Sequence, residues 1–247
     1  MASSGVGSRL VGFARSDAFR GGARAVAPGA AGIAVWALIT GVTMVQAGLS
    51  VPQALGMTVF VYSGTTQLAT LPMIVAGAPY WLVIATAVLV SLRFFVYSAV
   101  VAVDFGRLPL ARRLVLGYTT IDSGLAVYQA RRDALAGTAE RVRFLMGANA
   151  LIWVVWQAGS VVGVLAGGLA PRSAGSFAFL GTLAVGALLV PLLRGAPSLA
   201  CALAAAVVSI ALDALPWKLG LFAGILAGAA VAVGATRLRA TRQAGAP

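Results

Sequence analysis

The sequence is poor in the side chains that most enzymes use for chemistry. It contains no histidine, a single cysteine and six acidic residues among 247. The absence of histidine excludes His-ligated metal sites and histidine general bases, and the lone Cys201 excludes an intramolecular disulfide. No GxxxxGK[ST] motif is present, so no ATP-driven motor is built into the chain. Carboxylate chemistry alone stays open, and we expect no enzyme, no metal site and no cofactor.

Charged residues are also scarce, because they make up 10% of the chain against 60% hydrophobic residues, with a mean hydropathy of +0.96. Soluble domains typically carry about 25% charged and about 45–50% apolar residues. The apolar residues come in long runs, and a membrane-spanning helix needs roughly 20 of them. We therefore predict an all-α, polytopic helical protein in the lipid bilayer, with about six to eight membrane segments. The apolar segments are 28–48, 53–76, 79–103, 113–130, 144–170, 176–193, 198–215 and 219–236.

The charge pattern divides the chain into three parts. We predict a cytoplasmic, basic, amphipathic arm over residues 1–27, a transmembrane helical domain over 28–236 and a basic cytoplasmic tail over 237–247. The arm carries four arginines against one Asp17 and lacks the apolar core of a secretory signal. An organelle transit peptide is the alternative interpretation of the arm.

Basic residues also constrain the topology, because short cytoplasmic loops are enriched in Lys and Arg. If all eight segments cross, 12 basic residues lie inside and five outside. If 53–76 and 113–130 each enter and leave on one side, 15 lie inside and two outside. Both arrangements place the termini in the cytoplasm, on the inner face of the plasma membrane. The net charge of +12 then serves orientation and contact with anionic lipid, and we expect no nucleic-acid partner.

A polar stretch, SGTTQ, interrupts the apolar segment 53–76. Glycine weakens helices, and Ser and Thr hydroxyls compete with helical backbone bonds. Broken helices at membrane depth line cavities in many transporters, where the N-termini of half-helices bind anionic groups. We therefore predict a broken helix at 63–67, a new helix beginning near Thr66, and a substrate site there; the alternative is a continuous helix with a small-residue packing face. The predicted site residues are Ser63, Gly64, Thr65, Thr66 and Gln67.

Three charged residues lie within apolar segments, where ionisable groups are costly and usually face a protein interior or a cavity. Arg93 is flanked on both sides by apolar sequence, and it is interpreted either as a structural ion pair or as the counter-ion of a substrate or coupling carboxylate. Asp122 sits in the polar run TTIDSG and is predicted to bind substrate and to take part in coupling. Asp213 lies near a segment end, where an interfacial ion pair with Lys218 is the alternative to a coupling role.

Nearly the whole chain, including the final pair of apolar segments, resembles the AzlC family, the large subunit of azaleucine-resistance-type exporters of branched-chain amino acids, and the resemblance is carried by residues 48–101 and 119–131. The features that carry the resemblance are Gly48–Ser50, the break Tyr62–Gln67, the turn Ala76–Gly77–Ala78, Arg93 in an apolar span, and Asp122 in TTIDSG. The family's usual His after the Arg is Phe94 here, and its usual Glu after the Asp is Ser123. If that His or Glu serves proton coupling in the family, this chain couples differently or belongs to a divergent branch with another substrate.

The resemblance implies an exporter of branched-chain or similar small apolar amino acids, working with a small four-span, AzlD-like partner subunit. We expect an integral membrane secondary transporter subunit, driven by protons or by the membrane potential, since one charge moved through 100 mV yields about 2.3 kcal/mol. The substrate carboxylate would meet Thr65 and Thr66, and its ammonium group would meet Asp122. The alternatives are a membrane channel and a non-transporting membrane scaffold subunit.

Overall fold

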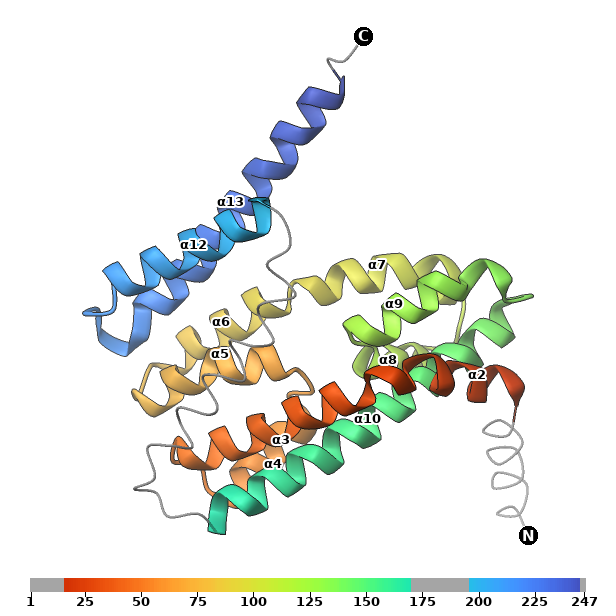
Figure 1. Cartoon of the computed structure of the whole chain (residues 1–247), viewed down its shortest axis with the longest axis horizontal. Helices are drawn as coiled ribbons and strands as arrows, with labels where there is room; N and C mark the ends of the chain where they lie inside the picture. Colours follow the sequence, from red (N-terminus) through yellow and green to blue (C-terminus); the bar gives the residue numbers. More distant parts are fainter. Residues whose placement is uncertain (1–15, 170–195, 245–247) are drawn as a thin grey trace. The chain divides into compact units, whose positions relative to one another are not determined.

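The computed structural model describes residues 16–169 and 196–244, and every regular element in these ranges is helical (Figure 1). The chain divides into two compact units. The first comprises Met1–Gly64 and Ser91–Pro171, and the second comprises Thr65–Val90 and Arg172–Pro247. The predicted segment 176–193 lies outside the described residues.

Two helices of the described chain are long and apolar enough to cross a membrane. One is the continuous stretch of 30 residues formed by α2 (Asp17–Val26), the 3-10 turn η1 (Ala27–Gly29) and α3 (Ala30–Gln46). The other is α10 (Thr138–Leu169), with 32 residues. A third span results if α6 (Tyr80–Ser91) and α7 (Arg93–Phe105) count as one, and shorter apolar helices accompany them. The predicted all-α membrane fold is therefore confirmed for the described residues.

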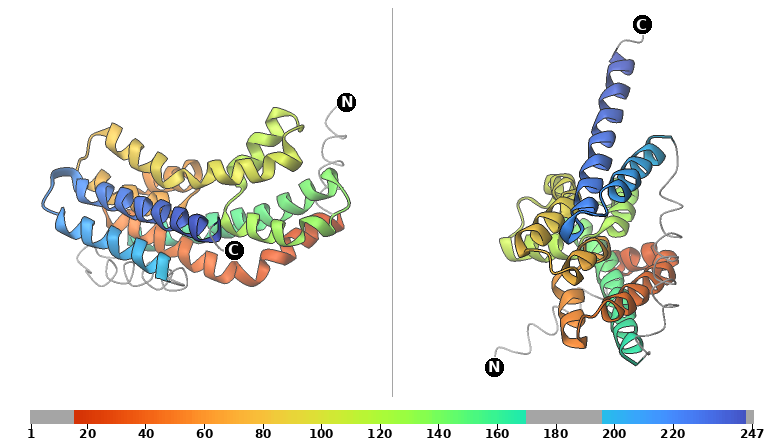
Figure 2. Two further views of the ribbon diagram at one scale, coloured as in Figure 1. Left: turned by 90° about the horizontal axis from the view of Figure 1, so that it is seen from above. Right: turned by 90° about the vertical axis from the view of Figure 1, so that its left-hand side faces the viewer.

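The stretch α2–α3 packs along α10 through glycines, and Figures 1 and 2 show α3 and α10 side by side. A Cβ atom on Gly41 of α3 would lie 2.4 Å from the carbonyl oxygen of Ser160, and one on Gly163 of α10 would lie 2.0 Å from that of Leu38. Only glycine permits backbones to approach so closely, as small-residue packing faces do in membranes. We call this contact the glycine seam. Its glycines are Gly22, Gly41, Gly147, Gly159, Gly163 and Gly167.

Two glycine turns end helices in the region that resembles the AzlC family. Gly48 (φ 107) follows α3, and Gly77 (φ 66) follows α5 (Gly64–Val75). At both turns the glycine N–H and the next N–H bond carbonyl oxygens of the last helical turn, which is the Schellman arrangement. Ser50 then starts α4 (Val51–Phe60) with a capping box. The small-residue motifs at 48–50 and 76–78 are thus explained as helix ends.

The break in segment 53–76 is present, but it lies earlier than predicted. Helix α4 ends at Phe60 and α5 begins at Gly64, so the non-helical residues are 61–63 and not 63–67. Ser63 donates its N–H to the carbonyl of Val61, which closes a three-residue turn. Serine is favoured immediately before a helix, and glycine costs little in a first turn. The alternative of one continuous helix is wrong.

Two further predicted segments are also interrupted. Segment 79–103 was expected to be a single span, but α6 ends at Ser91 and α7 begins at Arg93. Segment 113–130 consists of α8 (Leu110–Thr119) and α9 (Asp122–Arg131), joined by two extended residues. With ten residues each, α8 and α9 are roughly 15 Å long, about half the thickness of a bilayer core.

An ion cluster shows how the hairpin α8–α9 is placed in the first unit. Asp104, at the end of α7, accepts hydrogen bonds from Arg132 Nε (2.6 Å) and Arg141 Nη1 (2.5 Å). Arg132 begins the 3-10 turn η2 (Arg132–Ala134) after α9, and Arg141 lies in the first turn of α10. The end of α7, the end of α9 and the start of α10 therefore meet, and the pair α8–α9 leaves and returns at the same end of the first unit.

The second unit contains α5, α6 and a pair of helices at the C-terminal side, α12 (Ala196–Ala211) and α13 (Leu219–Ala244). Helices α12 and α13 lie side by side (Figures 1 and 2). A Cβ atom on Gly224 of α13 would lie 2.6 Å from the carbonyl oxygen of Ala205, so glycines form this contact too. The turn between them contains the short helix η4 (Pro216–Lys218), in which Trp217 has φ 56.

Candidate functional site

Three helix breaks of the first unit each contribute one polar side chain to a single cluster. Arg93 begins α7 and Asp122 begins α9, and their Nη1 and Oδ2 atoms are 3.2 Å apart. Arg93 also donates from Nη2 to the hydroxyl of Ser63 over 3.3 Å, at the break before α5. The side chains of Arg93 and Asp122 are 32% and 51% exposed, so a small solute can reach the pair. We call Ser63, Arg93 and Asp122 the break cluster.

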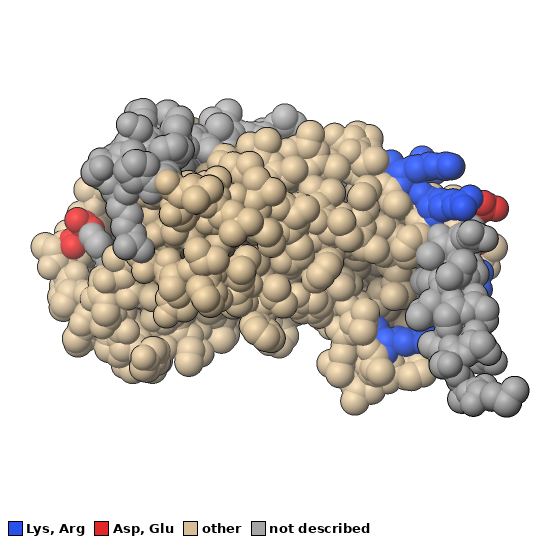
Figure 3. Space-filling model, turned by 90° about the horizontal axis from the view of Figure 1, so that it is seen from below, with Lys and Arg blue, Asp and Glu red and all other residues tan. Residues whose placement is uncertain are grey.

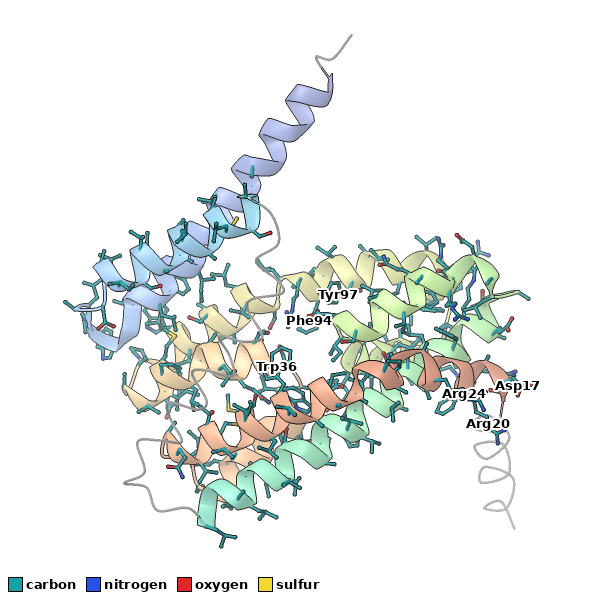
Figure 4. All side chains as sticks on the ribbon, in the orientation of Figure 1. Asp17, Arg20, Arg24, Trp36, Phe94 and Tyr97 are labelled. Atoms are coloured by element: carbon teal, nitrogen blue, oxygen red, sulfur yellow. The ribbon has the colours of Figure 1, made fainter. Side chains whose placement is uncertain are left out.

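Two aromatic side chains of α7, Phe94 and Tyr97 (Figure 4), contact the break cluster. Tyr97 donates its hydroxyl to the second carboxylate oxygen of Asp122. The guanidinium of Arg93 lies 5.2 Å from the ring centre of Phe94, and the rings of Phe94 and Tyr97 meet edge to face at 5.7 Å. Arg93 and Tyr97 are one helical turn apart, so their side chains share a face of α7. Tyr97 was not predicted from the sequence, although this spacing from Arg93 could have indicated it.

The middle of α10 supports the break before α5. Trp156 donates from Nε1 to the hydroxyl of Thr58 over 3.2 Å, and Gln157 donates to the carbonyl of the same residue over 3.1 Å. Tyr62 packs edge to face on Trp156, and Trp36 of α3 does the same from another side. The hydroxyl of Tyr62 is buried and has no hydrogen-bond partner among the described residues. Trp156, Tyr62 and Ala37 form a packed core beneath the break.

Gly64 packs closely against the ring of Trp156. A Cβ atom at this position would lie 2.4 Å from the Cη2 atom of Trp156. The first residue of α5 is therefore glycine because a ring occupies the space of a side chain. This contact ties the position of the break to α10.

A buried amide holds the other non-helical turn, between α8 and α9. Asn149 of α10 donates from Nδ2 to the hydroxyls of Thr120 (2.9 Å) and Thr119 (3.3 Å). A Cβ atom on Gly124 would lie 2.3 Å from Oδ1 of Asn149, so α9 runs close over the amide. Because Asp122 lies between these contacts, α10 fixes the start of α9 and with it the carboxylate of the break cluster.

The remaining predicted site residues lie in the second unit and are described separately. Thr65, Thr66 and Gln67 form the first turn of α5, with Thr66 and Gln67 buried. The carbonyl of Thr66 accepts the hydroxyl of Thr70 over 2.8 Å. Asp213 is exposed in the turn after α12. Of the predicted residues, the first unit thus brings together Ser63, Arg93 and Asp122.

The ion cluster at the end of α7 was missed by sequence reasoning. The side chain of Asp104 is only 5% exposed and binds two arginines, and it also accepts the hydroxyl of Tyr128 over 2.6 Å. The hydrogen bond and charge of Asp104 raise the pKa of the Arg132 guanidinium above its ordinary value. Asp104 directly follows an apolar run, and a carboxylate at such a position suggests an exposed residue at the membrane–water interface.

Figure 3 shows Lys and Arg gathered at the end of the first unit where α2 begins, and Figure 4 shows Arg20 and Arg24 there.

A small hollow lies beside the break cluster, between α7 and α8. Its volume is about 90 Å³. Tyr97, which bonds Asp122, and Thr120, which is bound by Asn149, border it at the end nearest the cluster. Apolar and small side chains of both helices form most of the remaining wall. They include Phe94, Val101, Ala102, Phe105, Leu116 and Gly117.

The chemistry of this site is that of ion binding. Within the described ranges no group of three or more His, Cys, Asp or Glu side chains could hold a metal ion. The break cluster offers a guanidinium for a carboxylate, a carboxylate for an ammonium group, and two hydroxyls beside them. Charge-assisted hydrogen bonds of this type are about twice as strong as neutral ones.

Comparison with known proteins places the chain in a family. The profile described as AzlC protein matches residues 28–170, which is more than half of the chain and includes the breaks, the break cluster and all of the glycine seam except Gly22. Neither a curated protein nor a solved structure matches the chain. The expected resemblance is thereby confirmed, and the chain belongs to the AzlC family, a family of membrane transporter components.

Proposed function

We propose that this chain is the large subunit of a secondary transporter that exports branched-chain or similar apolar amino acids across the plasma membrane. The observation that carries the proposal is the break cluster, in which three interrupted helices present one cation, one anion and hydroxyls to a small solute. Broken helices of this kind form the substrate sites of many secondary transporters. Membership in the AzlC family supports the same class of function.

A zwitterion suits the break cluster because it carries both charges that the cluster can bind. Arg93 and Asp122 share one contact of 3.2 Å, and the second guanidinium nitrogen of Arg93 is turned to Ser63. An amino acid can separate the pair by giving its carboxylate to Arg93 and its ammonium group to Asp122. One ion pair is then exchanged for two, and the net charge of the site stays the same. The hydroxyls of Ser63 and Tyr97 orient the two groups.

Coupling follows from the same exchange. When a substrate carboxylate engages Arg93, Asp122 loses its cation and needs another, which is either the substrate ammonium group or a proton. Asp122 is therefore our proposed coupling residue, in a chain that has Phe94 and Ser123 where the family's usual His and Glu are expected. The predicted roles of Thr65, Thr66 and Gln67 in substrate binding and of Asp213 in coupling stay separate proposals for the second unit, where Asp213 is exposed in a turn. The small AzlD-like subunit stays a proposed partner.

Reconstitution tests the function directly. Proteoliposomes that contain the full chain and its co-encoded small subunit should take up radiolabelled leucine in counterflow, with saturation and with competition by valine, isoleucine and methionine. Saturation is expected because each substrate occupies the break cluster before it moves. Vesicles that lack the small subunit are the control and should be inactive. Flux that rises linearly with leucine concentration would indicate a channel, and absence of any flux would leave a scaffold role.

The hairpin α8–α9 makes the topology testable. We propose that its two ends lie in the cytoplasm together with both termini, since arginines surround them. In a Cys201→Ser background, Arg107→Cys and Ala134→Cys should resist a membrane-impermeant maleimide in intact cells and react after permeabilisation. Ser50→Cys, in the turn at the other end of α3, should react from outside. Labelling of Arg107→Cys in intact cells would contradict the arrangement.

A further inference from the structure

The hollow between α7 and α8 adjoins the break cluster closely enough to share its ligand. Tyr97 both borders the hollow and binds Asp122, and Phe94 both borders it and stacks on Arg93. Thr120, which follows α8 and precedes Asp122 by two residues, also borders it. A ligand that binds Arg93 and Asp122 thus has an apolar space within reach of the same atoms.

The lining and size of the hollow define what fits. Most of its lining residues are aliphatic, aromatic or small, while Ser98 and the exposed Arg113 add polar groups besides Tyr97 and Thr120. An apolar cavity of about 150 Å³ holds benzene, which has six carbon atoms, so about 90 Å³ corresponds to roughly four carbons. Isopropyl, isobutyl and sec-butyl groups have that size.

We propose that this hollow holds the aliphatic side chain of the amino acid whose charged groups bind Arg93 and Asp122. The inference rests on the proposed function and names the residues that select the substrate. Gly117 of α8 and Ala102 of α7 are small lining residues, one from each of the two helices that border the hollow. A Cβ atom on Gly117 would meet no atom within 4 Å, so a larger residue there fills the space without striking the backbone.

Substitution of either wall tests the assignment. Gly117→Leu and Ala102→Leu, each in the full chain with its small subunit, should reduce competition by leucine and isoleucine at least tenfold while competition by alanine changes less than twofold. A single methylene in an apolar pocket changes selectivity by about 10- to 200-fold, which sets this expectation. The assay is counterflow of radiolabelled alanine and of radiolabelled leucine.

Matched controls separate pocket filling from damage to a helix. Gly32→Leu places the same residue at a helical glycine of α3 with no atom within 4 Å, and Ala99→Leu lies on α7 outside the lining of the hollow. Both controls should keep the wild-type preference. The proposal would be overturned if both wall variants remain inserted and their transport of all substrates falls equally, or does not fall at all. The hollow would then be a contact with lipid or with the small subunit instead. If the wild-type protein transports no amino acid, the proposed function itself is wrong, and this outcome is distinct from a failure of the side-chain pocket alone.

Discussion

Replacing Arg93 with leucine is expected to reduce leucine transport to background while the protein remains inserted in the membrane. The variant removes the cation of the break cluster, so a substrate carboxylate loses its partner and Asp122 loses its counter-ion. Hydrogen bonds to charged groups are worth about 1.5–3 kcal/mol each, which corresponds to roughly 10- to 150-fold in affinity for one lost bond. Counterflow activity, normalised to the amount of protein in the membrane, measures the effect.

Two further variants sharpen this expectation. Arg93→Lys should restore little activity, because a lysine offers a point charge and cannot bond Asp122 and Ser63 in the planar arrangement of a guanidinium. Arg112→Leu removes an exposed arginine of α8 and is the matched control, which should transport normally. Full activity in Arg93→Leu would show that the residue is a bystander and would defeat the assignment of the break cluster.

Gly64→Leu is expected to abolish transport for a steric reason. Even a Cβ atom at this position would lie 2.4 Å from the ring of Trp156, so the first turn of α5 and the break before it must shift. Gly64→Ala should already cost about 1–3 kcal/mol, the usual penalty for overpacking a well-filled site. Transport activity and the thermal stability of the purified subunit are the two measurements.

A compensating change distinguishes this contact from a general loss of folding. Combining Gly64→Ala with Trp156→Phe provides room for the methyl group and should recover part of the stability and of the transport. Gly56→Ala in α4, where an added Cβ meets no atom within 4 Å, is the matched control. If Gly64→Leu is as active as the wild type, the fit of the break against α10 has no functional role.

The sequence was sufficient to predict the break at SGTTQ and the charges within apolar segments, because both are local signals. The interruptions before Arg93 and before Asp122 were not predicted. Polar residues in an apolar run mark an interruption whatever the tertiary structure, and Arg93 stands out against its neighbours. The first break begins two residues earlier than predicted, because the whole run SGTTQ weakens helices, while the boundary depends on the ring of Trp156, about 90 residues away in the chain.

The partners within the site could not be read from one sequence. Arg93 and Asp122 are 29 residues apart and meet only because both begin helices after a break. Tyr97 was overlooked because tyrosine is ordinary in a membrane segment, and its spacing of four residues from Arg93 was its only signal. Asp104 carried no signal of an ion cluster, because a carboxylate after an apolar run suggests the membrane–water interface. Its partners Arg132 and Arg141 come from later elements.

The glycine seam restricts how the gene for this chain can change in length. One residue inserted near the middle of α10 would turn everything after it by about 100° around the helix axis. Ala158, Val162 and Ala166 would then occupy the places of Gly159, Gly163 and Gly167, two of which leave space for no side chain against α3. Insertions and deletions should therefore be excluded from α10, and length differences among related chains should collect in the connections between helices.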